Sequence, residues 1–415
     1  TIFFSGILGV LRGYFQAHGT MVPTSFSQIL EQILNAVVSI LAAFLLMRMV
    51  AGQDDTTQAI YGASGSAIGT GAGVLIALLF MLFVLALNRR VLAKQERRDR
   101  SGELLETGEV YRIIITMVTP IILSTFIYNC NSSLNLTIYT RIMEYVKGMS
   151  EADAYTQYGL FSGKAKQISN IPIALASAMS TAVIPGVAGS FARKDIRETN
   201  RKIAAAVRTT MLLSIPSAVG LAVLAKPVVL LLYPQKESVD MVSRLLAGLS
   251  ISVVFYAIST ISNGILQGIG KVNLPVINAA AALVVQTAAL VLLLLLTDMG
   301  LYSLVIATVL YSFLMCILNG ISVKRELGYR QEVVKTFCIP FWASIIMGGA
   351  ALGVYYGLYH LLPMNVVCLA AALLVSVLLY FVLVIKMGAV GERDLMSLPK
   401  GAFLVHMARR CRLIP

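Results

Sequence analysis

Long, uninterrupted runs of apolar residues alternate along this chain with short polar or charged stretches. A helix needs about 20 predominantly apolar residues to cross the hydrocarbon core of a bilayer. Membrane-spanning strands would be about ten residues long and would alternate in polarity, so these continuous runs predict helices. The expected segments are one partial span, Thr1–Leu11, and ten full spans: Ser27–Met47, Ala67–Leu87, Ile113–Leu136, Ile168–Val187, Ala204–Leu232, Met241–Leu266, Pro275–Leu296, Leu301–Val323, Phe337–Tyr359 and Val366–Ile385.

Composition agrees with this pattern. Hydrophobic residues make up 58% of the 415 residues and charged residues only 13%, whereas a soluble domain carries about 25% charge. An ordinary cytoplasmic enzyme and a disordered chain are therefore excluded. The predicted fold class is an all-α polytopic membrane protein.

The net charge of +13 would suggest nucleic-acid binding in a soluble protein. In a membrane protein, basic residues collect in cytoplasmic loops. If the loop after the first partial span is cytoplasmic, most of the 33 lysines and arginines fall on that side. We therefore expect no nucleic-acid partner and a cytoplasmic C-terminus.

Residues that bind metals or cofactors are sparse. The cysteines Cys130, Cys316, Cys338, Cys368 and Cys411 form no C-x-x-C pair, and His18, His360 and His406 are far apart in sequence. We expect no metal site, no disulfide framework and no cofactor. No Walker loop occurs either, so any transport would be coupled to Na⁺, to H⁺ or to the membrane potential, and the sequence leaves these alternatives open.

One short motif occurs twice, six expected spans apart. Gly13-Tyr-Phe-Gln16 is followed by Pro23, and Gly264-Ile-Leu-Gln267 is followed by Pro275. Glycine permits a tight reversal, and a proline that opens a helix lacks an amide that would have no partner there. We interpret both as loops that precede a helix, and Gly13, Gln16, Pro23, Gly264, Gln267 and Pro275 as hinge candidates. Parallel repeats of this kind build transporters whose halves rock about a cavity.

The repeat also predicts the domain organisation. If the two halves match, three helices of about 140 residues precede this chain, and the whole is a fourteen-helix, two-lobe bundle. The expected parts are residues 1–88 (remainder of the N-terminal lobe), 89–112 (cytoplasmic linker), 113–323 (C-terminal lobe), 324–386 (two additional helices) and 387–415 (basic cytoplasmic tail).

Polar residues inside spans are costly and need partners or water. Four of them share one face of the first full span, at helical spacing: Gln28, Glu31, Gln32 and Asn35. This face either lines a cavity, with Glu31 as a cation or proton site, or makes hydrogen bonds between helices. Arg12, in the preceding inner loop, either binds a lipid phosphate or anchors the helix end.

Further candidates lie in the third and fourth full spans. Asn129, Asn131 and Asn135 either line a hydrated cavity or hold helices together. Lys164 and Lys166 stand at the expected outer start of the next span. They either meet an anionic headgroup or extend their ammonium groups to the interface.

The run Leu11-Arg-Gly-Tyr-Phe-Gln16, followed by Met21-Val-Pro-Thr-Ser-Phe-Ser-Gln-Ile-Leu-Glu-Gln32, resembles polysaccharide biosynthesis proteins of the stage V sporulation protein B type. These belong to the multidrug/oligosaccharidyl-lipid/polysaccharide exporter superfamily, whose relatives include lipid II flippases. The resemblance covers the whole chain, from the family's fourth helix to its fourteenth, and outside this run it is one of pattern.

The resemblance implies a transporter rather than an enzyme, located in the bacterial inner membrane. Its expected activity is alternating-access flipping of an undecaprenyl-linked oligosaccharide or peptidoglycan precursor, and its expected partners are this lipid-linked glycan, membrane lipids and cell-wall synthesis enzymes. Cationic residues of the lipid II branch lie mostly in the first two helices, outside this chain. A further arginine of that branch has no counterpart here, where Lys164, Lys166 and Gln167 stand instead.

Three alternatives remain open from the sequence. The chain could be a cation-coupled multidrug exporter of the same superfamily, or a membrane partner of cell-wall synthesis without transport activity. A membrane glycosyltransferase is a weaker alternative, because it would need a carboxylate cluster and the acids expected outside are scattered over several loops: Asp54, Asp55, Glu151, Asp153, Asp240 and Asp298.

Overall fold

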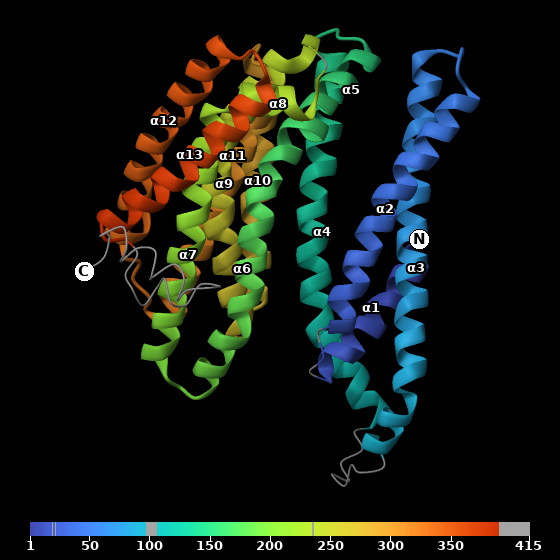
Figure 1. Cartoon of the computed structure of the whole chain (residues 1–415). Coiled ribbons are helices and arrows are strands. Elements are labelled where there is room, and N and C mark those ends of the chain that lie inside the picture. The colour runs from blue at the N-terminus through green and yellow to red at the C-terminus, as the bar shows by residue number, and fades with distance from the viewer. Residues whose placement is uncertain (19, 21, 97–105, 235, 390–415) are drawn as a thin grey trace. The chain divides into compact units, whose positions relative to one another are not determined.

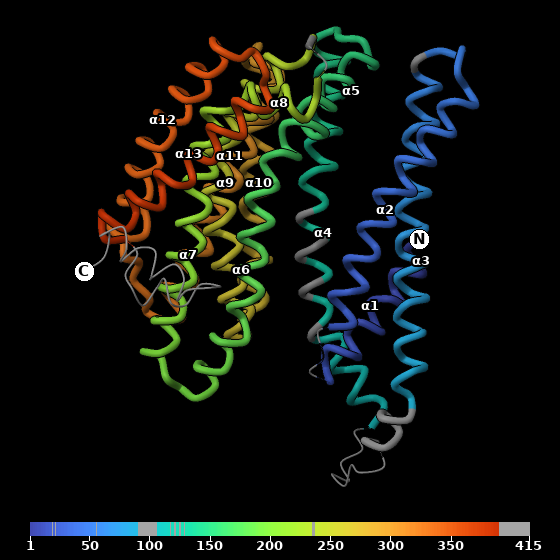
Figure 2. Tube along the Cα trace, viewed as in Figure 1, coloured from blue at the N-terminus to red at the C-terminus, as the bar shows by residue number. Residues whose placement is uncertain are grey.

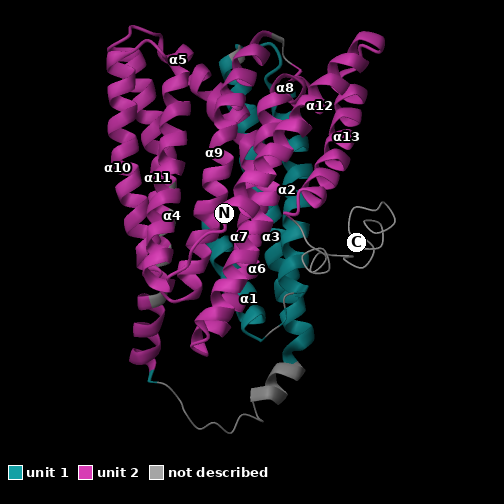
Figure 3. Ribbon diagram, turned by 90° about the vertical axis from the view of Figure 1, so that its left-hand side faces the viewer, with its two compact units in different colours: residues 1–106 teal, residues 107–415 magenta. Residues whose placement is uncertain are grey.

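The computed structural model describes the chain except residues 19, 21, 97–105, 235 and 390–415. It consists of two compact units, Thr1–Glu106 and Thr107–Pro415 (Figure 3), and each is described by itself. Gly19 and Met21 of the N-terminal motif, residues 97–105 of the expected linker and the expected basic tail from residue 390 onward lie outside the described residues.

Helices form both units (Figure 1). Unit 1 contains α1 (Ile2–Ala17), α2 (Val22–Met49) and α3 (Asp55–Glu96). Unit 2 contains α4 (Thr107–Tyr145), α5 (Glu151–Gly159), the π-helical segment η1 (Leu160–Ala165), α6 (Lys166–Ala192), α7 (Ile196–Val223), α8 (Ala225–Leu232), α9 (Lys236–Gly268), α10 (Asn273–Leu296), α11 (Leu301–Leu327), the π-helical segment η2 (Val334–Cys338), α12 (Ile339–Leu361) and α13 (Asn365–Lys386).

The all-α polytopic class is confirmed. In the part of the chain that the structure describes, nine helices are long and apolar enough to cross a membrane, and no strand forms. The expected span Ile113–Leu136 lies inside α4, a helix of 39 residues that is not among those nine. The partial span Thr1–Leu11 lies in the shorter helix α1.

Unit 1 is held together by close contact between α2 and α3. At Gly65 a Cβ atom would fall on the backbone of Ala43, and at Gly69 it would fall on Ser39. Four residues further along α3, a Cβ at Gly73 would lie 2.8 Å from the carbonyl oxygen of Glu31. Small residues at this spacing let two helix backbones approach in a membrane, where dispersion contacts replace the hydrophobic effect.

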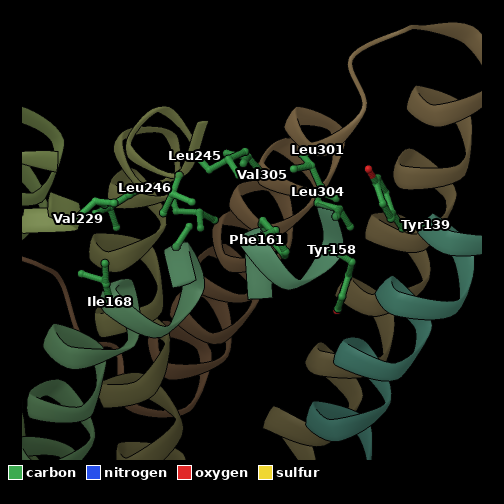
Figure 4. Close-up of a cluster of buried hydrophobic side chains, with 14 of the residues drawn as sticks. Tyr139, Tyr158, Phe161, Ile168, Val229, Leu245, Leu246, Leu301, Leu304 and Val305 are labelled. Carbon is green, nitrogen blue, oxygen red and sulfur yellow. The ribbon is translucent and has the colours of Figure 1, made fainter. Parts of the chain in front are cut away.

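The core of unit 2 surrounds α9, the most buried of its described spanning helices. At one end of α9, Leu245 and Leu246 pack with Phe161 of η1 and Leu304 of α11 (Figure 4). A second cluster lies along the other half of α9 and includes Ile261. The elements that carry the candidate site, α4, η1, α6, α9 and α11, all contribute residues to the first cluster.

One expected span is broken. The run Ala204–Leu232 was expected to form a single helix, but α7 ends at Val223 and α8 begins at Ala225. Figure 2 labels both elements on the Cα trace. Leu224 between them has φ −99° and ψ 21°. Pro227 lies in the first turn of α8, and because it has no amide hydrogen it cannot bond to the carbonyl of Val223. Hydropathy alone does not reveal this break.

In another place, the helix is longer than the apolar run that was expected to form a span. Ile168–Val187 is part of a continuous helical stretch from Glu151 to Ala192 that passes through η1. Ser150 caps its start by accepting a hydrogen bond from the Asp153 amide at 3.1 Å. Lys164 and Lys166 therefore lie inside a helix that begins well before them, and the expected span Ile168–Val187 is only its second part.

The repeated Gly-x-x-Gln motif is helical at both places, and not a loop. Gly13 and Gln16 lie in the last turn of α1, and Gly264 and Gln267 lie in the last turn of α9. Pro23 and Pro275 do fall in the first turns of α2 and α10. The second reversal is made by Gly270, whose φ is +77°.

Gly264 serves close packing instead of a turn. A Cβ there would fall on the Ser180 side chain of α6, whose hydroxyl donates to the Thr260 carbonyl at 2.9 Å. The glycine therefore lets α9 lie against α6. Gly13, by contrast, has no atom within 4 Å of the position that a Cβ would take.

Candidate functional site

Two charged residues of unit 1 face each other between α1 and α2. Arg12 Nη2 donates to Glu31 Oε2 at 2.7 Å, and Arg12 Nε donates to Ser27 Oγ at 2.8 Å. The Ser27 hydroxyl donates in turn to the Thr24 carbonyl at 2.7 Å. The two charged side chains retain 17% and 21% of their exposure. Each charge is therefore compensated inside unit 1, and the pair ties the end of α1 to α2.

The four polar residues that share one face of α2 form a polar stripe (Gln28, Glu31, Gln32 and Asn35), and it divides into two halves. Glu31 and Asn35 are half-buried, and Asn35 Oδ1 accepts hydrogen bonds from Ser39 at 3.0 Å and from Thr70 of α3 at 3.4 Å. Gln28 and Gln32 are exposed. Half of the stripe thus belongs to packing within unit 1, and the other half is accessible.

A polar pocket of about 370 Å³ lies within unit 2. Four helices supply its walls, chiefly with amide and hydroxyl groups: Asn131 and Ser132 of α4, Lys166, Ser169, Asn170, Ile173 and Ser177 of α6, Ser252, Tyr256, Thr260 and Asn263 of α9, and Thr308 of α11. Among these described lining residues Lys166 alone carries a charge. Its Nζ lies 3.3 Å from the Ser132 hydroxyl, to which it donates.

The two lysines that the sequence groups together separate at the π-helical segment. Lys166, the first residue of α6, lines the pocket. Lys164, in η1, turns toward α8 and α9, where its Nζ donates to Ser238 Oγ at 3.0 Å and lies 5.5 Å from the centre of the Tyr233 ring. Of these two lysines, only Lys166 can therefore contact a ligand in this pocket.

The asparagines of α4 also separate. Asn135 is 2% exposed and lies in the contact between α4 and α10, where Gln286 Nε2 donates to its Oδ1 at 2.6 Å. Asn135 donates to Asn131 Oδ1 at 3.0 Å, and Asn131 also lines the pocket. Asn129 is exposed. Asn131 therefore connects the pocket to an interhelical hydrogen bond.

Sequence reasoning missed several polar partners in the same unit. Asn278 of α10 donates to Asn319 Oδ1 of α11 at 2.9 Å, and Asn319 donates to Ser259 Oγ of α9 at 3.2 Å. Ser252, Tyr256, Thr260 and Asn263 fall on one face of α9 at spacings of four, four and three residues, and that helical spacing was a signal that could have found them. Gln286 was likewise visible as an isolated amide inside the expected span Pro275–Leu296.

Metal-binding groups are not clustered in this unit or the other. Among the described residues, no group of three or more histidine, cysteine, aspartate or glutamate side chains could hold a metal ion. The chemistry of the pocket is that of amides, hydroxyls and one ammonium group, which bind by hydrogen bonding and charge.

The apolar helices and the polar pocket of unit 2 define a polytopic helical membrane protein, and solved structures share its fold. A structure titled "Lipid II flippase MurJ, inward closed conformation" matches with a TM-score of 0.62 and 18% identity, over 92% of this chain and 71% of that one. A structure titled "Crystal structure of MATE in the straight conformation" matches with a TM-score of 0.56 and 16% identity, over 79% and 66%. At such identities the likeness concerns the fold.

The family follows from the sequence comparison. The family model described as "Lipid II flippase MurJ" matches residues 1–370, so the chain belongs to this family. Two relatives from Bacillus subtilis (strain 168) are "Lipid II flippase MurJ", 24% identical over 82% of this chain, and "Stage V sporulation protein B", 22% identical over 82%. The chain spans 62% and 63% of their lengths. The expected relationship to the exporter superfamily is confirmed, and the chain is a multi-pass membrane protein.

Proposed function

We propose that this chain forms the larger part of a flippase that moves an undecaprenyl-linked oligosaccharide or a peptidoglycan precursor like lipid II across the bacterial inner membrane. Alternating access of two lobes would expose the headgroup first on one side and then on the other. Family membership supports the transport class. The observation that carries the proposal is the polar pocket with Lys166, because polar groups are costly inside a membrane protein, and here amides, hydroxyls and one ammonium group from four helices border the same cavity.

The pocket suits part of such a headgroup. Its volume of about 370 Å³ lies at the lower end of the range for small-ligand sites, about 300 to 1,000 Å³. Amide and hydroxyl side chains such as Asn131 and Thr260 can pair with sugar hydroxyls, which both donate and accept. The Lys166 ammonium supplies a compact charge for a phosphate. The pocket would take one sugar or the diphosphate, and the prenyl tail would stay in the lipid.

The remaining expectations are proposals of the same kind. The C-terminus would be cytoplasmic, the accessible amides Gln28 and Gln32 would face the transport path, and the motifs at Gly13–Gln16 and Gly264–Gln267 would lie where helices bend. The cell-wall synthesis enzymes would supply or consume the substrate. Coupling would use Na⁺, H⁺ or the membrane potential, together with the same pocket.

The test compares two lysines that lie two residues apart. In the full-length protein reconstituted into vesicles, Lys166→Gln should slow the appearance of the precursor headgroup on the opposite leaflet about tenfold or more, because a charge-assisted hydrogen bond is worth about 1.5–3 kcal/mol. Lys164→Gln is the matched control, and it should stay within about twofold of the parent, since Lys164 lies outside the pocket. Equal rates for the parent protein and Lys166→Gln would remove the proposed site.

The same vesicles separate the alternatives. A multidrug exporter would expel a cationic dye under a sodium or proton gradient and leave the precursor in place. A non-transporting partner of cell-wall synthesis would move neither compound, although it would co-purify with a synthase. Either result would contradict the flippase proposal.

A further inference from the structure

A second hollow lies on unit 2, away from the pocket of Lys166. It measures about 770 Å³ and shares no lining residue with that pocket. Its walls come from the first turns of α7 and from the connection between α11 and η2, and they include Arg197, Arg201, Arg208, Tyr329, Arg330 and Glu332. Two segments that are far apart in sequence thus bring four guanidinium groups to one place.

The acids of the first segment are already engaged. Asp195 caps α7, because its Oδ1 accepts a hydrogen bond from the Glu198 amide at 2.9 Å. Glu198 accepts from Arg193 at 3.1 Å and pairs with Lys202 at 2.9 Å. Both carboxylates line the hollow, but among the described residues neither forms an ion pair with Arg197, Arg201 or Arg330.

The second segment, the connection between α11 and η2, forms an ion pair with α7 across the hollow. Arg208 Nη2 donates to Glu332 Oε2 at 2.7 Å, which joins α7 to the connection before η2. Asn200 strengthens the same junction by donating to the Leu327 carbonyl at 3.2 Å. These two contacts join the walls of the hollow.

Three positive charges remain without a carboxylate. Within the described ranges, Arg197, Arg201 and Arg330 take part in no ion pair. Arg197, Arg201 and Arg208 recur at helical spacing on one face of α7. A guanidinium group presents its N–H donors in a planar fork that fits two oxygens of a phosphate, so this clustering is suited to phosphate.

The neighbours of these arginines favour a phosphate that a lipid presents. Ile196, next to Arg197, is 42% exposed, and Val333 and Val334, which follow Glu332, are 57% and 64% exposed. Apolar side chains directly beside cationic ones match the boundary between acyl chains and headgroups. A soluble phosphate compound would leave these apolar side chains in water.

We propose that this hollow, formed by Arg197, Arg201 and Arg330 around the Arg208–Glu332 pair, is a binding site for the phosphate group of an anionic phospholipid. A phosphate bound there bridges α7 to the connection that leads to α12. The lipid then links α7 to the final two helices of the chain, α12 and α13.

The test uses the full-length protein in mixed micelles with phosphatidylglycerol, and it measures retained lipid by native mass spectrometry. The variant Arg197→Gln/Arg201→Gln/Arg330→Gln should bind the lipid about tenfold more weakly than the parent. The control, Arg48→Gln/Arg141→Gln/Arg244→Gln, loses the same charge at exposed arginines outside the hollow, and it should stay within about twofold. Equal retention by the two triple variants would overturn the proposal.

A second arm distinguishes the source of the phosphate. Excess inorganic phosphate should displace little phosphatidylglycerol from the parent protein, because the acyl chains contribute to binding. Complete displacement would overturn the lipid assignment and leave a site for soluble phosphate. The corresponding triple lysine variant keeps the charge but not the fork, and it should lie between parent and glutamine variant. Unchanged helicity by circular dichroism in all variants would show that binding and not folding was lost.

Discussion

The two units satisfy the polar groups inside their helices by different means. In unit 1, Arg12 and Glu31 neutralise each other, and the helices approach through glycines such as Gly69. In unit 2, amide pairs such as Asn135 and Gln286 join the helices, and Lys166 is left with a hydroxyl at 3.3 Å at the edge of a pocket. An intramembrane polar residue therefore marks a site only when its neighbours inside the protein leave some of its bonding capacity unused.

The largest expected effect tests the backbone contact of unit 1. In Gly69→Ala the new methyl group would fall on Ser39, so we expect a loss of about 2–3 kcal/mol in the free energy of unfolding. Gly71→Ala is the matched control, because its nearest neighbour, Thr1 Oγ1, is 3.4 Å away. Thermal unfolding in detergent measures both. Similar stabilities for the two variants would show that α2 and α3 do not depend on this approach.

The next effect tests the compensated charges. Either Arg12→Gln or Glu31→Gln should cost about 2 kcal/mol, because each change leaves one half-buried charge without its partner. The double variant should regain most of this loss, since no uncompensated charge remains. Unfolding of the parent, the single variants and the double variant gives the coupling energy. A coupling energy near zero would mean that water, and not the partner, satisfies these groups.

A smaller effect belongs to the amide pair of unit 2. Asn135→Leu and Gln286→Met keep the side-chain volumes but remove the hydrogen bond between α4 and α10. A double-mutant cycle should give a coupling energy of about 1 kcal/mol, as is usual for interhelical hydrogen bonds in membranes. A value that matches or exceeds the coupling of Arg12 and Glu31 would reverse the comparison between the units.

The smallest effect depends on pH, and it concerns an exposed ion pair outside the spans. Lys147 donates to Asp298 at 2.7 Å, and this hydrogen bond, with a smaller contribution from the lysine charge, lowers the pKa of Asp298. A lowered folded-state pKa contributes stability above the ordinary aspartate pKa of about 4, and this contribution is lost as the pH falls through the folded-state value. Asp298→Asn should therefore be slightly less stable than the parent at pH 7, with the difference vanishing in acid. A difference that persists at low pH would contradict the assignment.

The helical class could be predicted because hydropathy is local and a bilayer permits few alternatives. The break at Leu224 was missed, because hydropathy does not register the missing amide hydrogen of Pro227. The sequence grouped Lys164 with Lys166 and Asn131 with Asn135 by proximity along the chain. Their partners, Ser238 and Gln286, come from other helices, and only packing decides which of each pair lines the pocket.

The arginine-lined hollow could not be predicted from the sequence either, because its residues come from distant parts of the chain. Charge patterning treats Arg197, Arg201 and Arg330 only as part of the basic excess expected on the cytoplasmic side. Their convergence depends on the meeting of two connections that are distant in the chain, which single-sequence reasoning does not provide. The positions of Gly13 and Gly264 show that a glycine close to a helix end need not form a turn, because Gly264 permits a close helix contact instead.

The π-helical segment Leu160–Ala165 changes how residues of this helix can be compared with those of other proteins. A π turn accommodates one extra residue, and one residue corresponds to a rotation of about 100° in a helix. Sequence positions before 160 and after 165 are therefore out of phase with an uninterrupted helix. A numbering transferred from a relative without this turn would be accurate on one side and would point to the wrong face on the other.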